Sequence, residues 1–423
     1  MDKILEIVRH PFAALIRATS RNAAAMLRTE MFFSLISCMY SPYVTMYMLA
    51  LGLTELQVGF VASFTTAMQM VLCLLGAYLC DRFGRRNAMT VLDFFAWTVP
   101  MIFWALARDF AWFLAAAAFN SLFRVAMTPF QCFFVESTEP HKRVVGYSVM
   151  EIVVTAAGFV APAGAFLVGR LGLVPAMRGL YLLMAINTFG IYLWRYFTTK
   201  ENPIGEQKRQ EMQGVPVMGV LKSYFAVGKR FFTSPTLLLV VLFKAFMDAA
   251  TALRGTWFAT YLTGTLGFAE EWPAYAATIG SILTLLSLGI IMPRVTPHAG
   301  KPQLLWAAIA VMALGCLTII LSPVGSVTFL VLYLVLHTAG ISILSPCLQA
   351  LIANEIPDSD RAAMNALMTF ILMALQMPFG LLGGLAASGG NFRGPFVMIL
   401  CAFAIAALIL LPYAILKKKR MQS

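Results

Sequence analysis

The sequence predicts an all-α integral membrane protein with twelve transmembrane helices in two pseudo-symmetric six-helix bundles. The 423 residues are 60% hydrophobic and only 12% charged, and their mean hydropathy is +0.80. These values exclude an ordinary soluble domain. The apolar stretches reach the roughly 20 residues that a helix needs to cross a bilayer, and they are too long and continuous for barrel strands.

The predicted spans follow one another with short connections along most of the chain. Pro and Gly occur inside several of them, which a transmembrane helix tolerates because neighbouring helices and water can satisfy the freed backbone groups. We expect the spans at 28–50, 56–79, 88–107, 111–135, 144–169, 175–197, 236–264, 273–293, 302–322, 328–352, 362–386 and 394–416.

Polar segments divide the chain around these spans. Charged residues interrupt any apolar core of a cleavable signal near the N-terminus, and this segment is predicted to form an amphipathic surface helix. The longest polar stretch separates six spans from six. We therefore expect an N-terminal segment, a first bundle, a cytoplasmic linker, a second bundle and a basic tail at 1–27, 28–197, 198–235, 236–416 and 417–423.

The basic residues are distributed unevenly between the loops. The net charge of +12 could indicate a nucleic-acid partner. With both termini in the cytoplasm, however, 24 of the 31 Lys and Arg residues lie in cytoplasmic segments. This is the positive-inside pattern of a membrane protein. It predicts a multi-pass protein of the plasma (inner) membrane with cytoplasmic termini, with the lipid bilayer and not nucleic acid as its partner.

The sequence offers no set of residues typical of a cofactor site. The seven cysteines lie in or at the ends of apolar helices, and no pair has metal or redox spacing. No metal site is therefore expected. A phosphate-binding loop of P-loop type is also missing, so we expect a transmembrane ion gradient, of H⁺, as the energy source instead of ATP.

The two predicted bundles resemble each other weakly. The segment from Tyr47 to Glu55 after the first span parallels the segment from Tyr261 to Glu270 after the seventh. After the fourth and tenth spans, Glu136-Ser-Thr-Glu-Pro-His-Lys-Arg143 parallels Asn354-Glu-Ile-Pro-Asp-Ser-Asp-Arg361. Duplication of a six-helix unit is typical of secondary transporters, whose solute site lies near the midplane between the repeats.

The connection between the second and third spans carries a distinctive motif. It reads Ala77-Tyr-Leu-Cys-Asp81-Arg82-Phe-Gly84-Arg85-Arg86. This resembles the loop signature G-x-L-x-D-R-x-G-R-R of the major facilitator superfamily, with Ala77 in place of the first glycine. Together with the helix count and the repeat, the resemblance covers nearly the whole chain.

The resemblance implies a gate on the cytoplasmic side. In the family, the loop aspartate meets the start of the eleventh helix, here near 362–364, where it can cap the positive end of a helix. The loop arginines pair with an acid after the fourth helix, here Glu136, and we expect Arg82 or Arg86 to do so, together with Arg143. The candidate gate residues are Asp81, Arg82, Gly84, Arg85, Arg86, Glu136, Arg143 and Arg361.

Eight ionisable side chains fall inside the predicted spans. A charge at membrane depth costs about 2.5–3.5 kcal/mol or more, so such residues face water or a partner. In the family, helices 1, 4, 7 and 10 line the central cavity, and six of the eight lie on these helices. With two nearby aromatic residues, the candidates for solute or proton binding are Glu30, Arg124, Lys244, Asp248, Arg254, His337, Tyr43 and Trp257.

Several of these residues also have a structural interpretation. Lys244 and Asp248 are four positions apart, so a local salt bridge would let both be buried. His337 could be a hydrogen-bonded structural residue. The remaining two ionisable groups, Asp93 and Glu151, are expected to pair with loop arginines.

The predicted function is secondary active transport of a small solute by alternating access, in a monomer that is not an enzyme. Asp248, Glu30 or His337 could carry a coupling proton. One alternative is an importer or exchanger of a small organic anion, because Arg124 and Arg254 from opposite halves could clamp a carboxylate or phosphate. A non-transporting membrane sensor or a membrane-embedded enzyme is the alternative from another class.

Overall fold

The structure is a computed structural model that describes residues 20–219, 234–298, 302–355 and 361–422. These residues contain helices and no β-strand. The predicted N-terminal surface helix and the amphipathic part of the linker around 217–232 lie largely outside the described residues.

The first half of the chain forms helices that run back and forth across the molecule. Several are continuous through a short 3-10 or π segment, so that two labels make one long helix. Their bounds are α3 (Arg21–Tyr40), η1 (Ser41–Tyr43), α4 (Val44–Ala50), α5 (Glu55–Leu72), η2 (Cys73–Leu75), α6 (Gly76–Phe83), α7 (Arg85–Asp93), η3 (Phe94–Thr98), α8 (Val99–Leu106), α9 (Phe110–Asn120), α10 (Phe123–Glu136), η4 (Pro140–Lys142), α11 (Arg143–Ala157), η5 (Gly158–Val160), α12 (Ala161–Leu171) and α13 (Leu173–Thr198).

The second half has fewer interruptions. A short linker helix precedes it, and most of its helices are longer than those of the first half. Their bounds are α14 (Pro203–Glu211), α16 (Pro235–Thr260), η6 (Tyr261–Thr265), α17 (Trp272–Ile290), α18 (Met292–Val295), η7 (Thr296–His298), α19 (Pro302–Ile320), α20 (Val327–Glu355), α21 (Arg361–Ala387), η9 (Ser388–Gly390) and α22 (Arg393–Gln422).

The helices agree approximately with the twelve predicted spans. Among the described residues, eleven helices are long and apolar enough to cross a membrane. The remaining predicted span, 28–50, is helical as α3, η1 and α4 but is less apolar than the others. It also begins at Arg21 instead of residue 28, because the Ser20 side chain accepts a hydrogen bond from the Ala23 N–H and caps the helix there.

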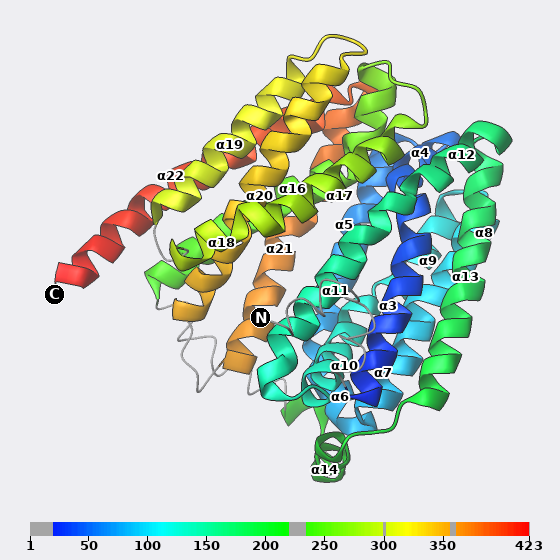
Figure 1. The fold of residues 1–423 in the computed structure, drawn as a ribbon, viewed down its shortest axis with the longest axis vertical. Coiled ribbons are helices and arrows are strands. Elements are labelled where there is room, and N and C mark those ends of the chain that lie inside the picture. The colour runs from blue at the N-terminus through cyan, green and yellow to red at the C-terminus, as the bar shows by residue number, and fades with distance from the viewer. Residues whose placement is uncertain (1–19, 220–233, 299–301, 356–360, 423) are drawn as a thin grey trace, which may run out of the picture.

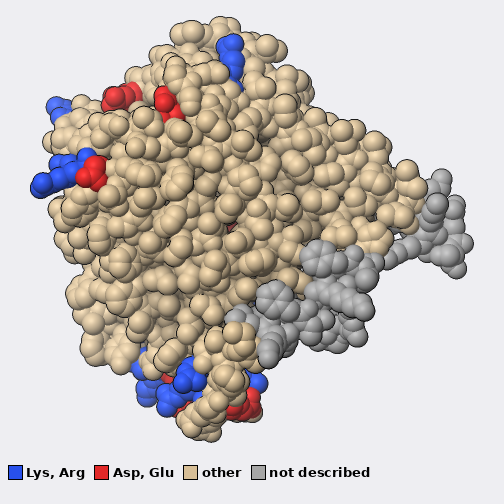
Figure 2. All heavy atoms as spheres, turned by 180° about the vertical axis from the view of Figure 1, so that it is seen from behind, with Lys and Arg blue, Asp and Glu red and all other residues tan. Residues whose placement is uncertain are grey.

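The two halves form two bundles that lie side by side (Figure 1). We call the end that carries Gly84 and α14 the linker end, and the opposite end, with the turns at Gly52 and Gly172, the far end. In Figure 1, α19 and α22 of the second half diverge from the first half toward the linker end. Charged side chains gather near the two ends on the face shown in Figure 2, with a broad band of other residues between them. This distribution fits a chain whose middle lies in lipid.

The halves meet along several helix pairs, among them α5 with α21, α12 with α17, α11 with α17, and α4 with α16. Glycines allow α5 and α21 to approach each other at backbone distance. A Cβ atom at Gly59 would lie 2.5 Å from the Gly380 carbonyl oxygen and 2.8 Å from Cα of Gly384. At the far end, the Gly390 N–H donates to Oε1 of Glu55 at 3.1 Å. Small residues at such a contact are typical of tightly packed membrane helices.

A side chain of the first half forms hydrogen bonds with the helix backbone of the second half. The Ser63 hydroxyl on α5 donates to the Met377 carbonyl at 2.6 Å and accepts from the Leu381 N–H at 2.8 Å. It therefore bonds to both members of a donor–acceptor pair that lie four residues apart on α21, the spacing of an α-helical hydrogen bond. Pro378 lies within the same turn of α21.

Candidate functional site

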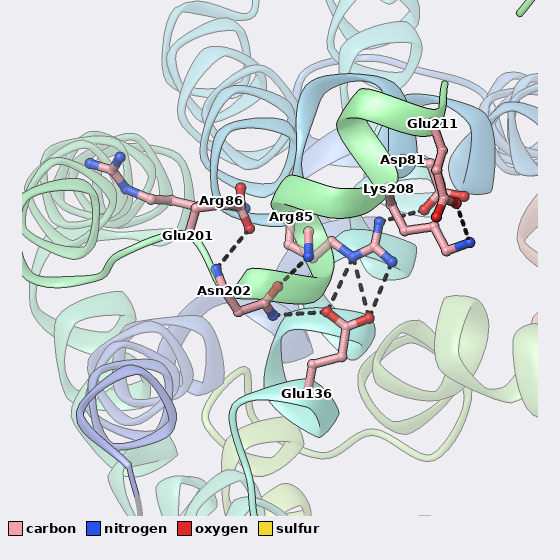
Figure 3. A network of polar contacts seen from close by, with 9 residues as sticks. Asp81, Arg85, Arg86, Glu136, Glu201, Asn202, Lys208 and Glu211 are labelled. Carbon is pink, nitrogen blue, oxygen red and sulfur yellow. Dashed lines mark hydrogen bonds and ion pairs between the residues drawn. The ribbon is translucent and has the colours of Figure 1, made fainter. Parts of the chain in front are cut away.

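The motif between α6 and α7 forms a network of ion pairs and hydrogen bonds at the linker end (Figure 3). The Arg85 side chain is 5% exposed and lies at its centre. Its Nη1 pairs with Oδ1 of Asp81, four residues earlier, and its Nη2 donates to Oε1 of Glu136 at 3.1 Å. A guanidinium holds two carboxylates well because its donors point in fixed directions.

The linker adds two residues to this network that sequence reasoning missed. The Asn202 side chain donates to Oε2 of Glu136 at 2.8 Å and caps α14 by accepting from the Gly205 N–H at 2.6 Å. Oε2 of Glu201 accepts from the Arg86 N–H at 3.0 Å. Asn202 could have been identified, because Asn before Pro203 is a typical helix start. The contact of Asn202 with Glu136 could not have been identified from the sequence, because the two residues lie far apart along the chain.

Gly84 is required by this arrangement. Its φ of +81° lies in the left-handed region that favours glycine. A Cβ atom there would also lie 2.5 Å from Oε2 of Glu201. The glycine thus lets α7 begin directly under the Glu201 carboxylate. On the same turn, the Arg86 guanidinium lies over the Tyr196 ring at 4.0 Å, which ties the motif to the end of α13.

The acids and bases of the linker differ in their surroundings. Burial raises the pKa of the Glu201 carboxyl, and the N–H groups of Arg86 and Asn202 oppose this effect. Lys208 donates to Glu211 at 2.7 Å on α14. This hydrogen bond raises the pKa of Lys208 and lowers that of Glu211. The Lys208–Glu211 pair is solvated, so its net contribution to stability is small.

The structure brings together only part of the predicted gate. Glu136 pairs with Arg85 and not with Arg82 or Arg86, because Arg85 is the motif arginine whose side chain points to the end of α10. Arg82 instead lies over the Tyr78 ring at 5.7 Å. Arg143 donates to the carbonyls of Val135 and Thr138 at 3.2 and 3.3 Å.

The predicted contact of Asp81 with the start of the eleventh helix stays a prediction. Asp81 pairs with Arg85 of its own loop in this structure. Residues 356–360 and the side chains of 361–363, which include that of Arg361, are not among the described parts of the chain.

A cavity of about 540 Å³ lies between the halves. The first half contributes Ser41, Pro42 and Thr155 to its lining, and the second half contributes residues of α16, α17 and α20. Helices 1, 7 and 10 thus line it as expected. The other lining residues come from the fifth and eighth helices, and none of those that the structure describes comes from the fourth.

Arg254 and His337 give this cavity its charge and much of its polarity. Nε of Arg254 donates to the Tyr333 hydroxyl at 2.7 Å, and the guanidinium lies over the Phe258 ring at 4.9 Å. The His337 ring stacks on Tyr333 with centroids 5.6 Å apart. Tyr333, which the sequence analysis did not single out, thus orients both polar groups toward the cavity. No Asp or Glu lies among the described lining residues.

The other predicted cavity residues lie elsewhere. Lys244 donates to Oδ2 of Asp248 at 2.7 Å, as a pair four residues apart on α16. Arg124 on α10 lies close enough to Asp248 for an electrostatic interaction between the halves, but it does not line the cavity. The predicted clamp of Arg124 and Arg254 around one anion is not assembled in this conformation.

The two aromatic candidates are packed instead of exposed to the cavity. Tyr43 is fully buried beside the first turn of α17. Trp257 is 1% exposed and stacks on Phe392 with centroids 6.2 Å apart. Gly383 of α21 packs against Trp257, since a Cβ there would lie 3.1 Å from its Nε1.

Glu30 and the two remaining acids of the spans lie inside the first half. Glu30, Asp93 and Glu151 line a second cavity with Arg195. Asp93 pairs with Nη2 of Arg195 and not with a loop arginine. Arg195 lies at the end of α13, in the last turn of the sixth span.

These observations define a helical membrane protein of two bundles, with a solute-sized polar cavity between them and an ion-pair network around the sequence motif at one end. The family model of the Major Facilitator Superfamily matches residues 29–375, and the chain belongs to this superfamily. It is a multi-pass membrane transporter of small solutes and not an enzyme.

Solved structures share this fold at low sequence identity. A point mutant of the nucleoside transporter NupG matches with a TM-score of 0.71 and 13% identity over 92% of this chain and 99% of that chain. A bacterial homologue of the human lysosomal transporter Spinster matches with a TM-score of 0.66 and 14% identity, over 94% of this chain and 96% of that chain. The xylose transporter XylE from E. coli matches with a TM-score of 0.66 and 13% identity, over 92% of this chain and 96% of that chain. No curated protein matches the chain significantly.

Proposed function

We propose that this chain is a secondary transporter that carries a small organic anion across the plasma membrane by alternating access of the cavity between its halves. The proposed carrier is a monomer with both termini in the cytoplasm, so that the linker end faces the cytoplasm. The asymmetry of the basic residues supports this orientation.

The charge of the cavity lining carries the proposal. Arg254 is the one charged residue among the described lining residues. It donates to Tyr333 and has no carboxylate partner among them. An arginine keeps its charge at any relevant pH, and a charge at membrane depth is costly without a counter-ion. A carboxylate or phosphate of the solute would supply that counter-ion and could accept two parallel hydrogen bonds.

The rest of the lining fits a polar organic solute. Hydroxyl groups of Ser41, Thr155, Ser281 and Thr284 face the same space as His337. A volume of about 540 Å³ lies within the roughly 300–1,000 Å³ range of small-molecule sites. One solved neighbour is titled a human organic anion transporter, with 17% identity and a TM-score of 0.62, which is compatible with the proposal but shows only the fold.

The test combines ligand binding with flux. Purified protein would be screened for thermal stabilisation by monocarboxylates, dicarboxylates and phosphate monoesters, each beside its uncharged amide or alcohol. For the best anion, Arg254→Gln should weaken binding by about 1.5–3 kcal/mol, the cost of a lost hydrogen bond to an ion, or about 10- to 150-fold. Arg170→Gln, an exposed far-end arginine, is the matched control. Stabilisation by uncharged compounds or lipophilic cations alone would contradict the proposal.

Coupling to a proton gradient is the second part of the proposal, with Asp248 as its carrier. Protonation of Asp248 would release Lys244 from the 2.7 Å contact between them. Asp248→Asn should then retain exchange of the anion in proteoliposomes but lose accumulation driven by a pH gradient. If the double variant Lys244→Met/Asp248→Asn restores accumulation, Asp248 only neutralises Lys244 and this assignment is wrong.

A further inference from the structure

The first half contains a second, partly open cavity of about 380 Å³ that is separate from the cavity between the halves. Among the residues that the structure describes, all that line it belong to the first half, on α3, α7, η3, α10, α11 and α13. The transport cycle proposed above does not use this space. Its position inside one bundle means that a ligand could stay there while the two bundles move.

The lining carries an excess of negative charge. Asp93 and Arg195 neutralise each other in an ion pair. Glu30 and Glu151 also face this cavity, and neither forms an ion pair or hydrogen bond with any residue that the structure describes. Arg195 also acts electrostatically on Glu30, but one guanidinium can balance only one of the three carboxylates. The remaining negative charge is costly at membrane depth, and a bound cation would remove that cost.

An aromatic wall runs along the same cavity. Phe33 packs edge-to-face on Trp97 with centroids 4.8 Å apart, and Trp97 packs in the same way on Phe123 at 5.2 Å. Trp97 lies in the π-helical segment η3, which directly follows Asp93. Single π turns inside α-helices occur frequently at functional sites. Aromatic faces beside carboxylates are the surroundings that bind organic ammonium ions.

Arg195 contributes an unused donor. The residue is 2% exposed, and its Nε has no hydrogen-bond partner among the described residues although the atom is buried. Buried donors in native proteins nearly always find an acceptor. A ligand oxygen in this cavity would supply one.

We propose that this cavity, formed within the first half, binds a small organic ammonium ion that also carries a hydroxyl oxygen. The ammonium group lies against Trp97 and is neutralised by Glu30 and Glu151, and the hydroxyl oxygen accepts from Nε of Arg195. The site has the opposite charge preference to the cavity around Arg254. The proposal goes beyond the anion transport described above and does not depend on it.

Binding of radiolabelled choline to the purified full-length protein, measured by equilibrium dialysis, tests the proposal. We expect saturable binding that Glu30→Gln and Glu151→Gln each weaken at least tenfold. Glu270→Gln, an exposed far-end acid, should bind choline as the wild type does. Propyltrimethylammonium, which has a methyl group in place of the hydroxyl and therefore nearly the same size, should bind more weakly than choline.

The site of binding is assigned by two further variants. Trp97→Leu should weaken choline binding, while Arg254→Gln should leave it unchanged and weaken only the anion. The proposal fails if wild-type protein shows no saturable choline binding, if both Glu30→Gln and Glu151→Gln bind as the wild type does, or if Arg254→Gln abolishes the binding. Because Glu151 is exposed, its variant gives an answer even if Glu30→Gln does not fold.

Discussion

At the scale of single residues, Arg85 organises the linker end. It is the nearly buried cation that holds Asp81 and Glu136, and Glu136 in turn accepts from Asn202 (Figure 3). Removing one member of such a buried set leaves a charge without a partner, which costs more than the pair contributes. Arg82 and Arg86 differ from Arg85 because both lie over tyrosine rings.

The first prediction concerns the coupling between Arg85 and Glu136. In a double-mutant cycle with Arg85→Gln and Glu136→Gln, we expect an interaction energy of about 1–3 kcal/mol, since the two side chains are in direct contact. Thermal unfolding of the purified variants would measure it. The same cycle with Arg82→Gln in place of Arg85→Gln should be additive. Equal interaction energies in the two cycles would contradict the prediction, because Glu136 would then respond to the summed charge of the motif arginines and not to Arg85 specifically.

Some of these contacts could be predicted from the sequence and others could not. Lys244 with Asp248 follows from a spacing of four residues on one helix. Asp81 with Arg85 has the same spacing, but the Gly84 turn between α6 and α7 separates them. Asp93 with Arg195, and Glu201 with the Arg86 N–H, join residues about a hundred positions apart. These depend on the angle and depth at which helices pack, which hydropathy does not encode.

At the scale of elements, the linker helix α14 is held against the motif of the first half. Asn202 starts it, Glu201 fixes its approach to α7, and the Tyr78 hydroxyl donates to the Val215 carbonyl beyond it at 3.3 Å. The sequence predicted the linker as a polar connection but not this docking. Polar composition identifies a segment outside the membrane without showing which surface it contacts.

The second prediction is that α14 docks more tightly at acidic pH. Burial raises the pKa of Glu201 in the docked state, so protonation favours docking. This contribution is fully present below the pKa of the undocked carboxyl and is lost as the pH rises through the docked pKa. Hydrogen exchange of the α14 amides, corrected for intrinsic rates, should therefore be slower at pH 5 than at pH 7.5.

The control for this prediction is Glu201→Gln, which cannot titrate. It should remove the pH dependence of the exchange, whereas Glu206→Gln on the exposed side of α14 should retain it. Unchanged pH dependence in Glu201→Gln would assign the effect to another group of the network.

At the scale of the whole molecule, the halves approach each other near the far end and diverge toward the linker end (Figure 1). The two-bundle architecture could be predicted from span count and repeat. The conformation could not, because a transporter's sequence must stabilise several arrangements nearly equally. For the same reason, the separation of Arg124 from Arg254 belongs to one arrangement of the bundles.

The third prediction is that anion binding changes the distance between the two halves in opposite directions at the linker end and at the far end. Spin labels at Glu139 and Thr296 report on the linker end, and labels at Arg108 and Val324 report on the far end. Double electron–electron resonance should show the linker-end distance shortening and the far-end distance lengthening. Changes of the same sign at both ends would contradict alternating access. Two labels within one half, at Glu139 and Arg108, should keep their distance.

The hydroxyl of Ser63 has a consequence for how easily the far end can open. If α5 withdraws from α21, the Leu381 N–H can bond directly to the Met377 carbonyl four residues earlier, as in any α-helix. Ser63 can then donate to its own helix, as Thr65 does to the Val61 carbonyl at 2.8 Å. The Ser63 hydroxyl, the Leu381 N–H and the Met377 carbonyl would each exchange one hydrogen-bond partner for another. None of the three would be left without a partner in the membrane. At Ser63, the contact between α5 and α21 can thus open and close repeatedly without leaving a polar group unpaired.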